Sequence, residues 1–483
     1  MTRPSRLIIA CMGLLLPIAA LAKHSPQAEV AATPHKAAPH KPTALKARDL
    51  DEIRRSKTLR VLVNQSRNSS GMVGDKQIGV ENVRLQAFES YLNGHASPAQ
   101  RIHLKIIPKP KEQLLGALLR GEGDVVAPGE RIDASALQGL AASAPTVERA
   151  PMILVGGKGT RSFTRVEQLA GHTVALPAGS AAGGAIEAIN DKLAQRRLRP
   201  IQVEWVDASL AVEDVLEMVQ AGIYPLTAVE QPIAERWTKV MPGLRPQRKL
   251  TLDSPGQLRW YTRANTPLLG ATVDRFVGDY QAPADQDTAF VKAYARLYKV
   301  HYPLAKADRR RLEQLRPLLQ RTAREQGMDW LTLAALAFKE SALNPSAKGG
   351  GGATGLLQIT PSAAKRVGVA NIQEVDNNVQ AGAKYLALIQ RKFFSSRKLD
   401  ERQRMAFVLA AYNLGPERVQ AMRVEARKRG LNPDQWFFQV ERVALEQVGM
   451  GPVSYVNSVN KYYLAFDRER DSLEPQGRKL AER

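Results

Sequence analysis

The period of the hydrophobic pattern changes once along this chain, and that change limits the possible folds more than any other feature. Between residue 57 and about residue 263, short apolar runs alternate with longer amphipathic stretches, whereas from about residue 312 onward only helical spacing remains. Alternation of strands and helices is typical of a parallel α/β sheet, and helical spacing alone predicts an all-α domain. The chain therefore contains an α/β part followed by a separate helical part.

The spacing of the apolar runs also places the individual elements. In the first part we expect strands at 58–63, 102–107, 124–126, 173–176, 202–205 and 258–263, with helices at 80–92 and 111–119. In the second part we expect helices at 312–326, 330–341, 378–393, 404–411 and 453–466.

Length and charge bound the number of domains and the kind of partner. The chain has 483 residues, which is too long for one hydrophobic core, and its formal net charge is +22. Such a charge favours an anionic partner, namely a nucleic acid, an anionic membrane surface or an acidic polymer. It is equally compatible with a soluble protein that has a basic surface.

The first residues are typical of a secretory signal. Arg3 and Arg6 precede the apolar run 7–21, and the small residue Ala22 follows as the expected cleavage site. The only cysteine, Cys11, lies inside this run with too short an apolar stretch before it, so lipidation is the less favoured alternative. Cleavage leaves no cysteine, which excludes disulfides and thiolate chemistry, and export argues against nucleic acid as the partner.

A glutamate near the end of the helix expected at 330–341 has the surroundings of a general acid. Asp329 is a suitable N-cap, and Glu340 lies in the last turn on the same stripe as the apolar Leu336. Partial burial and the helix dipole both raise the pKa of such a carboxyl, which keeps it protonated near neutral pH. Periodicity alone nevertheless favours a surface glutamate that pairs with Lys339 or with another cation.

Three motifs that follow this glutamate reverse that preference. They are GLLQ at 355–358, AGAKYL at 381–386 and AAYNLGP at 410–416. In this order they resemble the Slt-type, family 1 lytic transglycosylases, over about residues 315–463. The resemblance implies a lysozyme-like all-α fold with a glycan cleft and one catalytic glutamate, which maps onto Glu340.

The resemblance also implies a reaction that needs one carboxyl group. Glu340 would protonate the oxygen that links MurNAc to GlcNAc in peptidoglycan, while the substrate's own N-acetyl oxygen stabilises the developing cation. Glu340 would then act as a base on the C6 hydroxyl of MurNAc, which closes a 1,6-anhydro ring without water. A hydrolytic muramidase is the alternative, and it would need a second acid. Glu374 and Asp376 are the candidates for that acid, although exposed loop positions are favoured for both.

Five further residues are expected to line or support the cleft, by their positions in or near the motifs. Gln358 would hydrogen-bond sugar or acetamido groups, and Tyr412 would orient Glu340 or the N-acetyl group. Asn413 would fix the backbone or contact sugar, Ser341 would hold the helix end, and Tyr455 is a weaker candidate. Tyr412 as a core aromatic and Asn413 as a turn residue stay open as alternatives.

Two glycines depart from the family pattern. Gly349 stands where the family usually has a serine, within the glycine run 349–352, and Gly451 stands where the family has a second glutamate. A glycine run has extra conformational entropy to lose when it is ordered. The two glycines leave two alternatives open, namely a lower activity or an altered substrate preference, and a peptidoglycan-binding or sensing protein without useful turnover is a second hypothesis.

The α/β part resembles the family-3 periplasmic solute-binding proteins over about residues 57–280. The similarity rests on TLRV at 58–61, GDVV at 123–126 and LAGHTV at 169–174, and it implies a two-lobed clamp. In amino-acid-binding members an arginine clamps the ligand carboxylate, but Ala136 occupies that position in this chain.

Arg131, Glu230 and Ser180 remain as candidates for a ligand site in this module. Arg131 could replace the clamping arginine, and Glu230 falls near the acidic position that would take an amino group. Ser180 either binds an anion at a helix start or simply caps the helix. We therefore expect a ligand other than a free amino acid, with muropeptides as the candidate.

These inferences divide the chain into a signal peptide at 1–22, a disordered linker at 23–50, the solute-binding-like module at 51–283, a linker at 284–311, the lysozyme-like catalytic domain at 312–467 and a charged tail at 468–483. We expect peptidoglycan glycan strands as the substrate and a periplasmic location with peripheral attachment to the outer membrane. No metal cluster, phosphate-binding loop or nucleic-acid motif stands out in the sequence, so no cofactor, metal or nucleic acid is expected.

Overall fold

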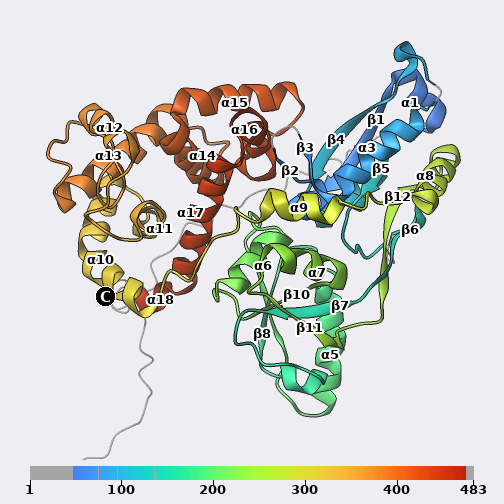
Figure 1. Cartoon of the computed structure of the whole chain (residues 1–483), viewed down its shortest axis with the longest axis horizontal. Coiled ribbons are helices and arrows are strands. Elements are labelled where there is room, and N and C mark those ends of the chain that lie inside the picture. Colours follow the sequence, from blue (N-terminus) through green and yellow to red (C-terminus); the bar gives the residue numbers. More distant parts are fainter. Residues whose placement is uncertain (1–46, 74–75, 95, 135–136, 475–483) are drawn as a thin grey trace, which may run out of the picture. The chain divides into compact units, whose positions relative to one another are not determined.

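The computed structural model describes residues 47–474 except 74–75, 95 and 135–136. The expected signal peptide with Cys11, most of the expected linker 23–50, Ala136 and residues 475–483 lie outside the described residues. Figure 1 shows the described elements coloured along the chain.

The first lobe is built on a five-stranded sheet with the strand order β4-β1-β5-β12-β6. Its strands are β1 Thr58–Asn64, β4 His103–Lys109, β5 Val125–Ala127, β6 Leu140–Ala150 and β12 Gly256–Arg263. The other elements of this lobe are α1 Leu50–Ser56, α2 Arg67–Ser70, β2 Met72–Val73, β3 Lys76–Gln77, α3 Val80–Leu92, α4 Leu114–Leu119 and α8 Pro267–Asp279. Phe88 of α3, Phe276 of α8 and Trp260 of β12 share one core on a face of this sheet.

The second lobe has its own five-stranded sheet, in the order β11-β7-β10-β8-β9. Its elements are β7 Met152–Gly156, β8 Thr173–Leu176, α5 Ala182–Gln195, β9 Gln202–Trp205, α6 Val212–Gln220, β10 Leu226–Glu230, α7 Gln231–Val240 and β11 Arg245–Thr251. Along β7, Met152 and Leu154 face the core that contains α5, whereas Ile153 and Val155 face the core that contains α6 and α7. Because both faces are covered, β7 is a continuous apolar run.

The two lobes confirm the expected two-lobed α/β arrangement, but both sheets are mixed rather than purely parallel. β1 is parallel to β4 and β5, and β8 is parallel to β9 and β10. The chain enters the second lobe between β6 and β7 and returns between β11 and β12, and these four strands pair antiparallel with their neighbours. The strand expected at 258–263 is β12, which lies in the first sheet and so returns the chain to the first lobe.

After α8 the described residues form helices joined by loops, apart from isolated bridges of Thr354 with Lys348 and Ile359. The helices are α9 Gln286–Tyr294, α10 Lys306–Gln326, α11 Trp330–Ser341, α12 Pro361–Arg366, α13 Val375–Phe393, α14 Glu401–Leu414, α15 Pro416–Lys428, α16 Glu441–Val448, α17 Met450–Arg468 and α18 Arg470–Leu473. The helix α9 and the first turn of α10 lie in the stretch expected as a linker, and α18 lies in the expected tail.

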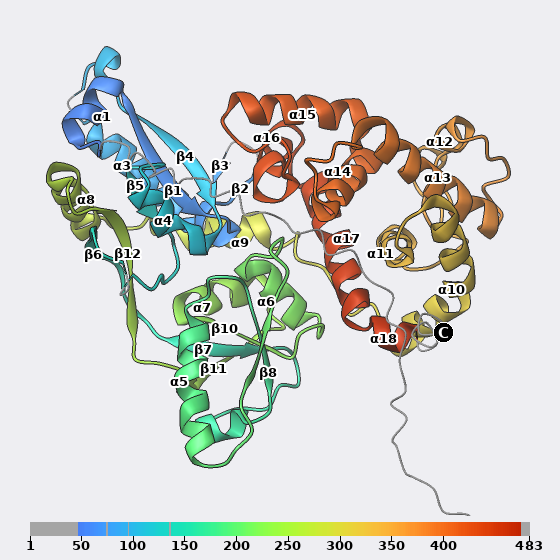
Figure 2. The same cartoon turned by 180° about the vertical axis from the view of Figure 1, so that it is seen from behind.

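The helix α11 lies beside α17 and α10 in the helical part, as Figure 2 shows. Its residues 330–338 are all buried, and it packs against α10 and α17. The Asp329 side chain caps its start by accepting the backbone N–H of Leu331 at 3.1 Å. It ends at Ser341 because Ala342 adopts a left-handed conformation with φ of 51°. A well-capped, buried helix of this kind gives the side chains of its last turn fixed positions.

Candidate active site

Glu340 lies in the last turn of α11, and a tyrosine from α17 meets it. The hydroxyl of Tyr455 donates a hydrogen bond of 2.5 Å to Oε1 of Glu340. Burial raises the pKa of the Glu340 carboxyl, while this hydrogen bond and the charge of Lys339 oppose the rise without cancelling it. The result is a half-buried carboxyl that holds its proton to a higher pH than a free glutamate does.

Tyr455 is itself well suited to hold this carboxyl. Its residue is 8% exposed, and burial together with the charge of Glu340 raises the pKa of its hydroxyl well above the usual value. The hydroxyl therefore stays protonated and acts as a donor at every physiological pH. Since Tyr455 lies 115 residues from Glu340, the packing of α17 on α11 fixes the orientation of the carboxyl.

Tyr412 of α14 is directed at the loop that follows α11. Its hydroxyl donates a hydrogen bond of 2.7 Å to the carbonyl oxygen of Leu357. Its ring centroid lies 5.7 Å from that of Tyr385 on α13, and burial raises the pKa of Tyr412, with the charge of Glu340 adding to the rise. Tyr412 thus holds the loop in place near Glu340 and makes its hydrogen bond to the backbone.

Gln358 adopts a left-handed conformation, with φ of 44°. Its amide nitrogen donates to the carbonyl oxygens of Ala347 at 3.2 Å and Gly355 at 2.8 Å. A Cβ atom at Gly349 would lie only 2.2 Å from Oε1 of Gln358. Because Gly349 has no side chain, the Gln358 carboxamide can occupy the space beside it.

This contact leads to a prediction about the glycine run. We expect Gly349→Ser to displace the Gln358 carboxamide from its two carbonyl partners, with a loss of about 1–2 kcal/mol in the free energy of unfolding, because each such bond contributes about 1 kcal/mol. Gly350→Ser is the matched control, since nothing lies within 4 Å of a Cβ at that position. Thermal or urea unfolding of both variants measures the difference, and equal stability would contradict the contact.

The remaining expected site residues have unequal surroundings. The Ser341 hydroxyl, which has one proton to donate, lies 2.9 Å from the carbonyl oxygen of Ala337 and 3.0 Å from that of Leu356, and so links the end of α11 to the loop. Asn413 is exposed in the last turn of α14. Gly451 is also exposed, at the start of α17, and a Cβ there would have no neighbour within 4 Å.

One residue that supports the loop was not expected from the sequence. Asn378 of α13 is 1% exposed. Its amide nitrogen donates to the carbonyl oxygens of Thr354 at 2.8 Å and Ile372 at 3.0 Å, and its amide oxygen accepts the backbone N–H of Leu357 at 3.0 Å. An asparagine on the apolar face of a helix was the available signal, because a buried amide needs partners.

The three residues expected to bind a ligand in the α/β module contact their own neighbours. The backbone N–H of Arg131 donates to Glu230 at 2.7 Å, and the Arg131 guanidinium pairs with Asp253 at 2.5 Å. The Ser180 hydroxyl accepts the backbone N–H of Ala182 at 3.3 Å. These three residues do not line a cavity to which both lobes of the module contribute.

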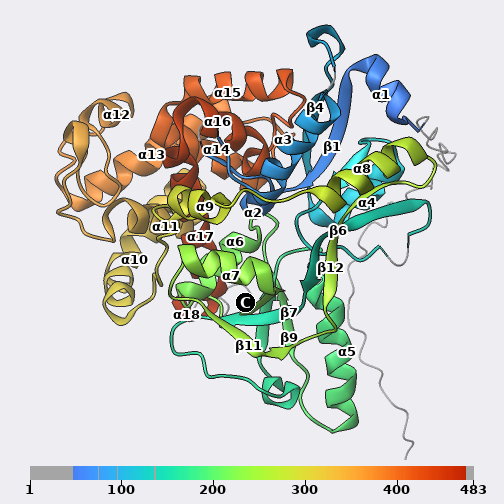
Figure 3. The same cartoon turned by 45° about the vertical axis from the view of Figure 1, so that its right-hand side comes forward.

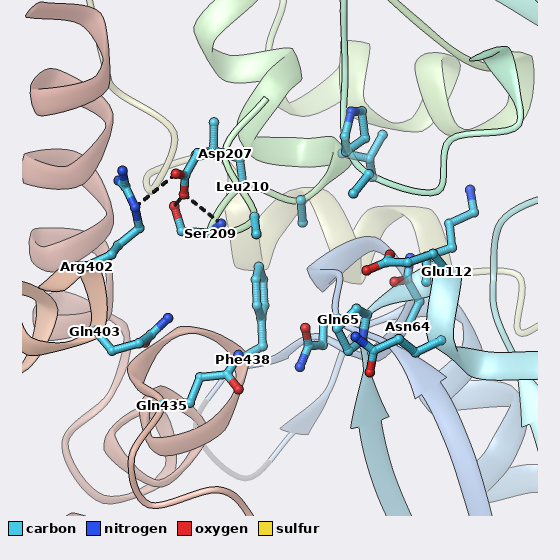
Figure 4. A pocket seen from close by; sticks show the side chains of 18 of the residues that line it. Asn64, Gln65, Glu112, Asp207, Ser209, Leu210, Arg402, Gln403, Gln435 and Phe438 are labelled. Carbon is cyan, nitrogen blue, oxygen red and sulfur yellow. Dashed lines mark hydrogen bonds and ion pairs between the residues drawn. The ribbon is translucent and has the colours of Figure 1, made fainter. Parts of the chain in front are cut away.

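That cavity has a volume of about 420 Å³ and takes its walls from both lobes and from the helical part. Figure 4 shows its labelled side chains: Asn64, Gln65 and Glu112 from the first lobe, Asp207, Ser209 and Leu210 from the second, and Arg402, Gln403, Gln435 and Phe438 from the helical part. Arg402 pairs with Asp207 at 2.9 Å. In its first-lobe wall, Glu130 accepts from Asn64 at 2.7 Å and from Lys111 at 2.9 Å.

The described residues contain no group of three or more His, Cys, Asp or Glu side chains arranged to hold a metal ion. Within the same residues, no helix is both long and apolar enough to cross a membrane.

Comparison with known proteins relates the helical part of the chain to a known domain family. The transglycosylase SLT domain family matches residues 317–434. The membrane-bound lytic murein transglycosylase F of Desulfosudis oleivorans is 26% identical over 400 residues, which are 80% of this chain and 82% of that protein. The protein of the same name from Shewanella pealeana is 27% identical over 409 residues, which are 81% of each.

Solved structures cover about half of this chain at low TM-scores. An L-arginine-bound amino acid transporter substrate-binding protein of Streptococcus pneumoniae is 17% identical, with 51% of this chain and 98% of that chain covered and a TM-score of 0.39. The arginine-bound form of a truncated arginine-binding protein from T. maritima is 19% identical, with 48% and 100% covered and a TM-score of 0.38.

Proposed function

On the premise that the chain is a lytic transglycosylase with an SLT domain at residues 317–434, we propose that it cleaves the MurNAc–GlcNAc β-1,4 bond of peptidoglycan and leaves 1,6-anhydro-MurNAc ends. Glu340 acts first as the acid and then as the base. The observation that carries the proposal is the half-buried Glu340 carboxyl, with a raised pKa and a hydrogen bond from Tyr455.

The proposed reaction follows from the surroundings of this carboxyl. Protonated Glu340 donates its proton to the glycosidic oxygen, and the bond to C1 of MurNAc breaks. The substrate's N-acetyl oxygen stabilises the positive charge at C1. The Glu340 carboxylate, still held by Tyr455, then removes the proton from the C6 hydroxyl, whose oxygen bonds to C1. Glu340 ends protonated, so the group is ready for the next cycle.

The two carboxylates that could serve hydrolysis are those of Glu374 and Asp376, and their surroundings favour the one-carboxyl mechanism instead. Glu374 and Asp376 are exposed at the start of α13. Asp376 pairs with Arg321 at 2.5 Å, and Glu374 accepts from Asn377 at 3.2 Å. An inverting glycosidase would need a second carboxylate about 6.5–9.5 Å from the acid, with room between the two for the water that it activates.

Digestion of purified sacculi tests the proposal, with the products identified by mass spectrometry. We expect anhydromuropeptides in the soluble fraction. Muropeptides with reducing ends would identify a hydrolase and overturn the proposed reaction. Absence of soluble products from protein that still pellets with sacculi would identify a wall-binding protein, which is the second hypothesis from the sequence.

The hydrogen bond from Tyr455 leads to a prediction on pH dependence. It stabilises the carboxylate form of Glu340, so Tyr455→Phe should raise the pKa of Glu340 further. Because the first step needs the protonated acid, the alkaline limb of the rate profile should move to higher pH. The maximal rate should fall roughly 10- to 100-fold, as expected for a lost hydrogen bond to a charged group. A pH–rate profile of anhydromuropeptide release measures both effects, and an unshifted alkaline limb would argue against Glu340 as the acid.

We further propose that the cavity in Figure 4 takes a muropeptide. The amides of Asn64, Gln65, Gln403 and Gln435 offer donors and acceptors to a peptide backbone, and Arg402 lies at the same cavity. Isothermal titration calorimetry with purified muropeptides tests this, with Gln65→Leu as the variant expected to weaken binding. Unchanged affinity of the variant would place the ligand elsewhere.

The relatives named membrane-bound lytic murein transglycosylase F also support a location. We propose a periplasmic enzyme that associates with a membrane surface.

A further inference from the structure

Exposed basic side chains gather at one end of the second lobe. This basic tip consists of Arg161, Arg165, Lys192, Arg196, Arg197 and Arg199, all of them exposed. They come from the loop after β7, from the turn before β8, and from the end of α5 with the loop that follows it. In Figure 3 the end of α5 lies at the extremity of the second lobe.

Hydrogen bonds hold these separate segments together. The backbone N–H of Gly171 donates to the carbonyl oxygen of Pro200 at 3.2 Å. A Cβ atom at Gly171 would lie 3.1 Å from the Arg199 guanidinium, and the Arg161 guanidinium lies 2.9 Å from Nε2 of His172. The basic tip is therefore one continuous surface of the fold.

Most of the positive charge of the basic tip is left unneutralised within the described residues. Glu167 pairs with Arg196, whereas Arg165, Lys192, Arg197 and Arg199 have no ion-pair partner in the described part of the chain. Such a set of free cations binds an anionic surface rather than an internal partner.

An aliphatic side chain stands in the middle of this charge. Leu198 lies between Arg197 and Arg199 and is 39% exposed. The backbone N–H of Leu198 donates to the Leu193 carbonyl at 3.0 Å, and Arg197 takes the left-handed position of this helix end, with φ of 56°. That position usually belongs to glycine, so the sequence keeps an arginine there against a conformational preference.

We propose that the basic tip docks the second lobe onto an anionic phospholipid surface, with Leu198 entering the headgroup boundary and the arginines and Lys192 contacting lipid phosphates. The exposed leucine favours lipid over the hydrated wall polymer, because an aliphatic side chain gains free energy from an acyl boundary and little from a polar glycan. The inference deepens the proposed membrane association by naming its surface. It does not depend on the proposed reaction, since Glu340 and Tyr455 lie in other elements.

Flotation with lipid vesicles tests the basic tip. The protein is the chain from residue 23 onward, and the vesicles contain phosphatidylethanolamine with or without phosphatidylglycerol. We expect binding only to the anionic vesicles, with loss of binding at high salt because surface charge is screened. The double variant Arg197→Glu/Arg199→Glu should bind about 30-fold more weakly or worse, since each basic residue near such a surface contributes roughly a factor of five. Leu198→Asp should also bind more weakly.

A matched control separates the basic tip from the general charge of the protein. Arg418 and Arg427 are exposed on α15 and have no ion pair among the described residues, so Arg418→Glu/Arg427→Glu changes the net charge equally. This control should bind as the unchanged protein does. Equal weakening of both double variants would overturn the proposal. If the tip variants bind the anionic vesicles as well as the unchanged chain does, the membrane association stands but lies on another surface, and the basic tip is not the docking site. If the tip variants lose binding to purified sacculi but still bind the vesicles, the basic tip binds the wall polymer, and the lipid assignment is likewise overturned.

Discussion

Glu340→Gln should abolish the release of anhydromuropeptides from sacculi. The glutamine keeps the size of the side chain and an oxygen that accepts from Tyr455, but it cannot donate and then remove a proton. General acid–base catalysis contributes about 10²- to 10⁴-fold, and in the proposed mechanism one group performs both proton transfers, so we expect a loss of at least about 10³-fold. Mass spectrometry of digested sacculi measures the release, and pelleting with sacculi measures binding, which should be unchanged.

Two controls make this expectation specific to Glu340. Glu374→Gln and Asp376→Asn remove the carboxylates that a hydrolytic mechanism would need, and both variants should retain activity within about twofold because surface substitutions rarely perturb a distant site. Thermal unfolding of Glu340→Gln checks that the fold is intact. Substantial residual release from a folded Glu340→Gln protein would remove Glu340 from the mechanism.

The local part of this site could be predicted from the sequence. The helix expected at 330–341 coincides with α11 Trp330–Ser341, because Asp329 caps its start and the apolar spacing continues to its end. The strands expected at 173–176 and 202–205 coincide with β8 and β9. In each case the signal is contained in a few consecutive residues, which is the range over which periodicity and turn residues act.

The parts of the site that depend on distant contacts could not be predicted in this way. The bond between Tyr455 and Glu340 joins residues 115 positions apart, and nothing in the local spacing of α17 indicates which of its tyrosines meets α11. The three bonds of Asn378 likewise depend on how α13 packs against the loop. The occupation of the space at Gly349 by the Gln358 carboxamide depends on a left-handed glutamine, a conformation that side-chain-bearing residues rarely adopt.

A buried group of charges between α17 and the second lobe is a further feature that the sequence did not indicate. The Lys461 ammonium pairs with Asp214 at 2.6 Å and with Glu217 at 2.5 Å, both on α6, and its side chain is 4% exposed. Arg67 of α2 pairs with Asp214 at 3.4 Å and with Glu441 of α16 at 3.2 Å. Burial alone raises the pKa of Asp214, but the charges of Lys461 and Arg67 bring it below the usual value.

Lys461→Met should therefore destabilise the protein by about 3–5 kcal/mol, the usual cost of removing one partner from a buried ion pair. Methionine keeps the length of the side chain, so the loss arises from carboxylates that remain buried without their cation. Urea unfolding followed by tryptophan fluorescence measures it. Arg429→Met is the matched control, because the exposed pairs of Arg429 with Glu425 and Glu446 should contribute less than about 1 kcal/mol.

The pH dependence of the Lys461→Met variant identifies the cause of its instability. Without Lys461, the folded-state pKa of Asp214 should rise above its unfolded value. A carboxyl whose pKa is higher in the folded state than in the unfolded state binds its proton more tightly when folded. Its contribution to stability is therefore present below the unfolded-state pKa and is lost as the pH rises through the folded-state pKa. The variant should consequently lose less stability relative to the unchanged protein at pH 5 than at pH 8. Asp214→Asn in the Lys461→Met background should recover part of the loss, because it removes the uncompensated charge and keeps a polar group in its place. A loss that is equal at both pH values and insensitive to Asp214→Asn would show that packing around Lys461, rather than its charge, holds α17 to α6.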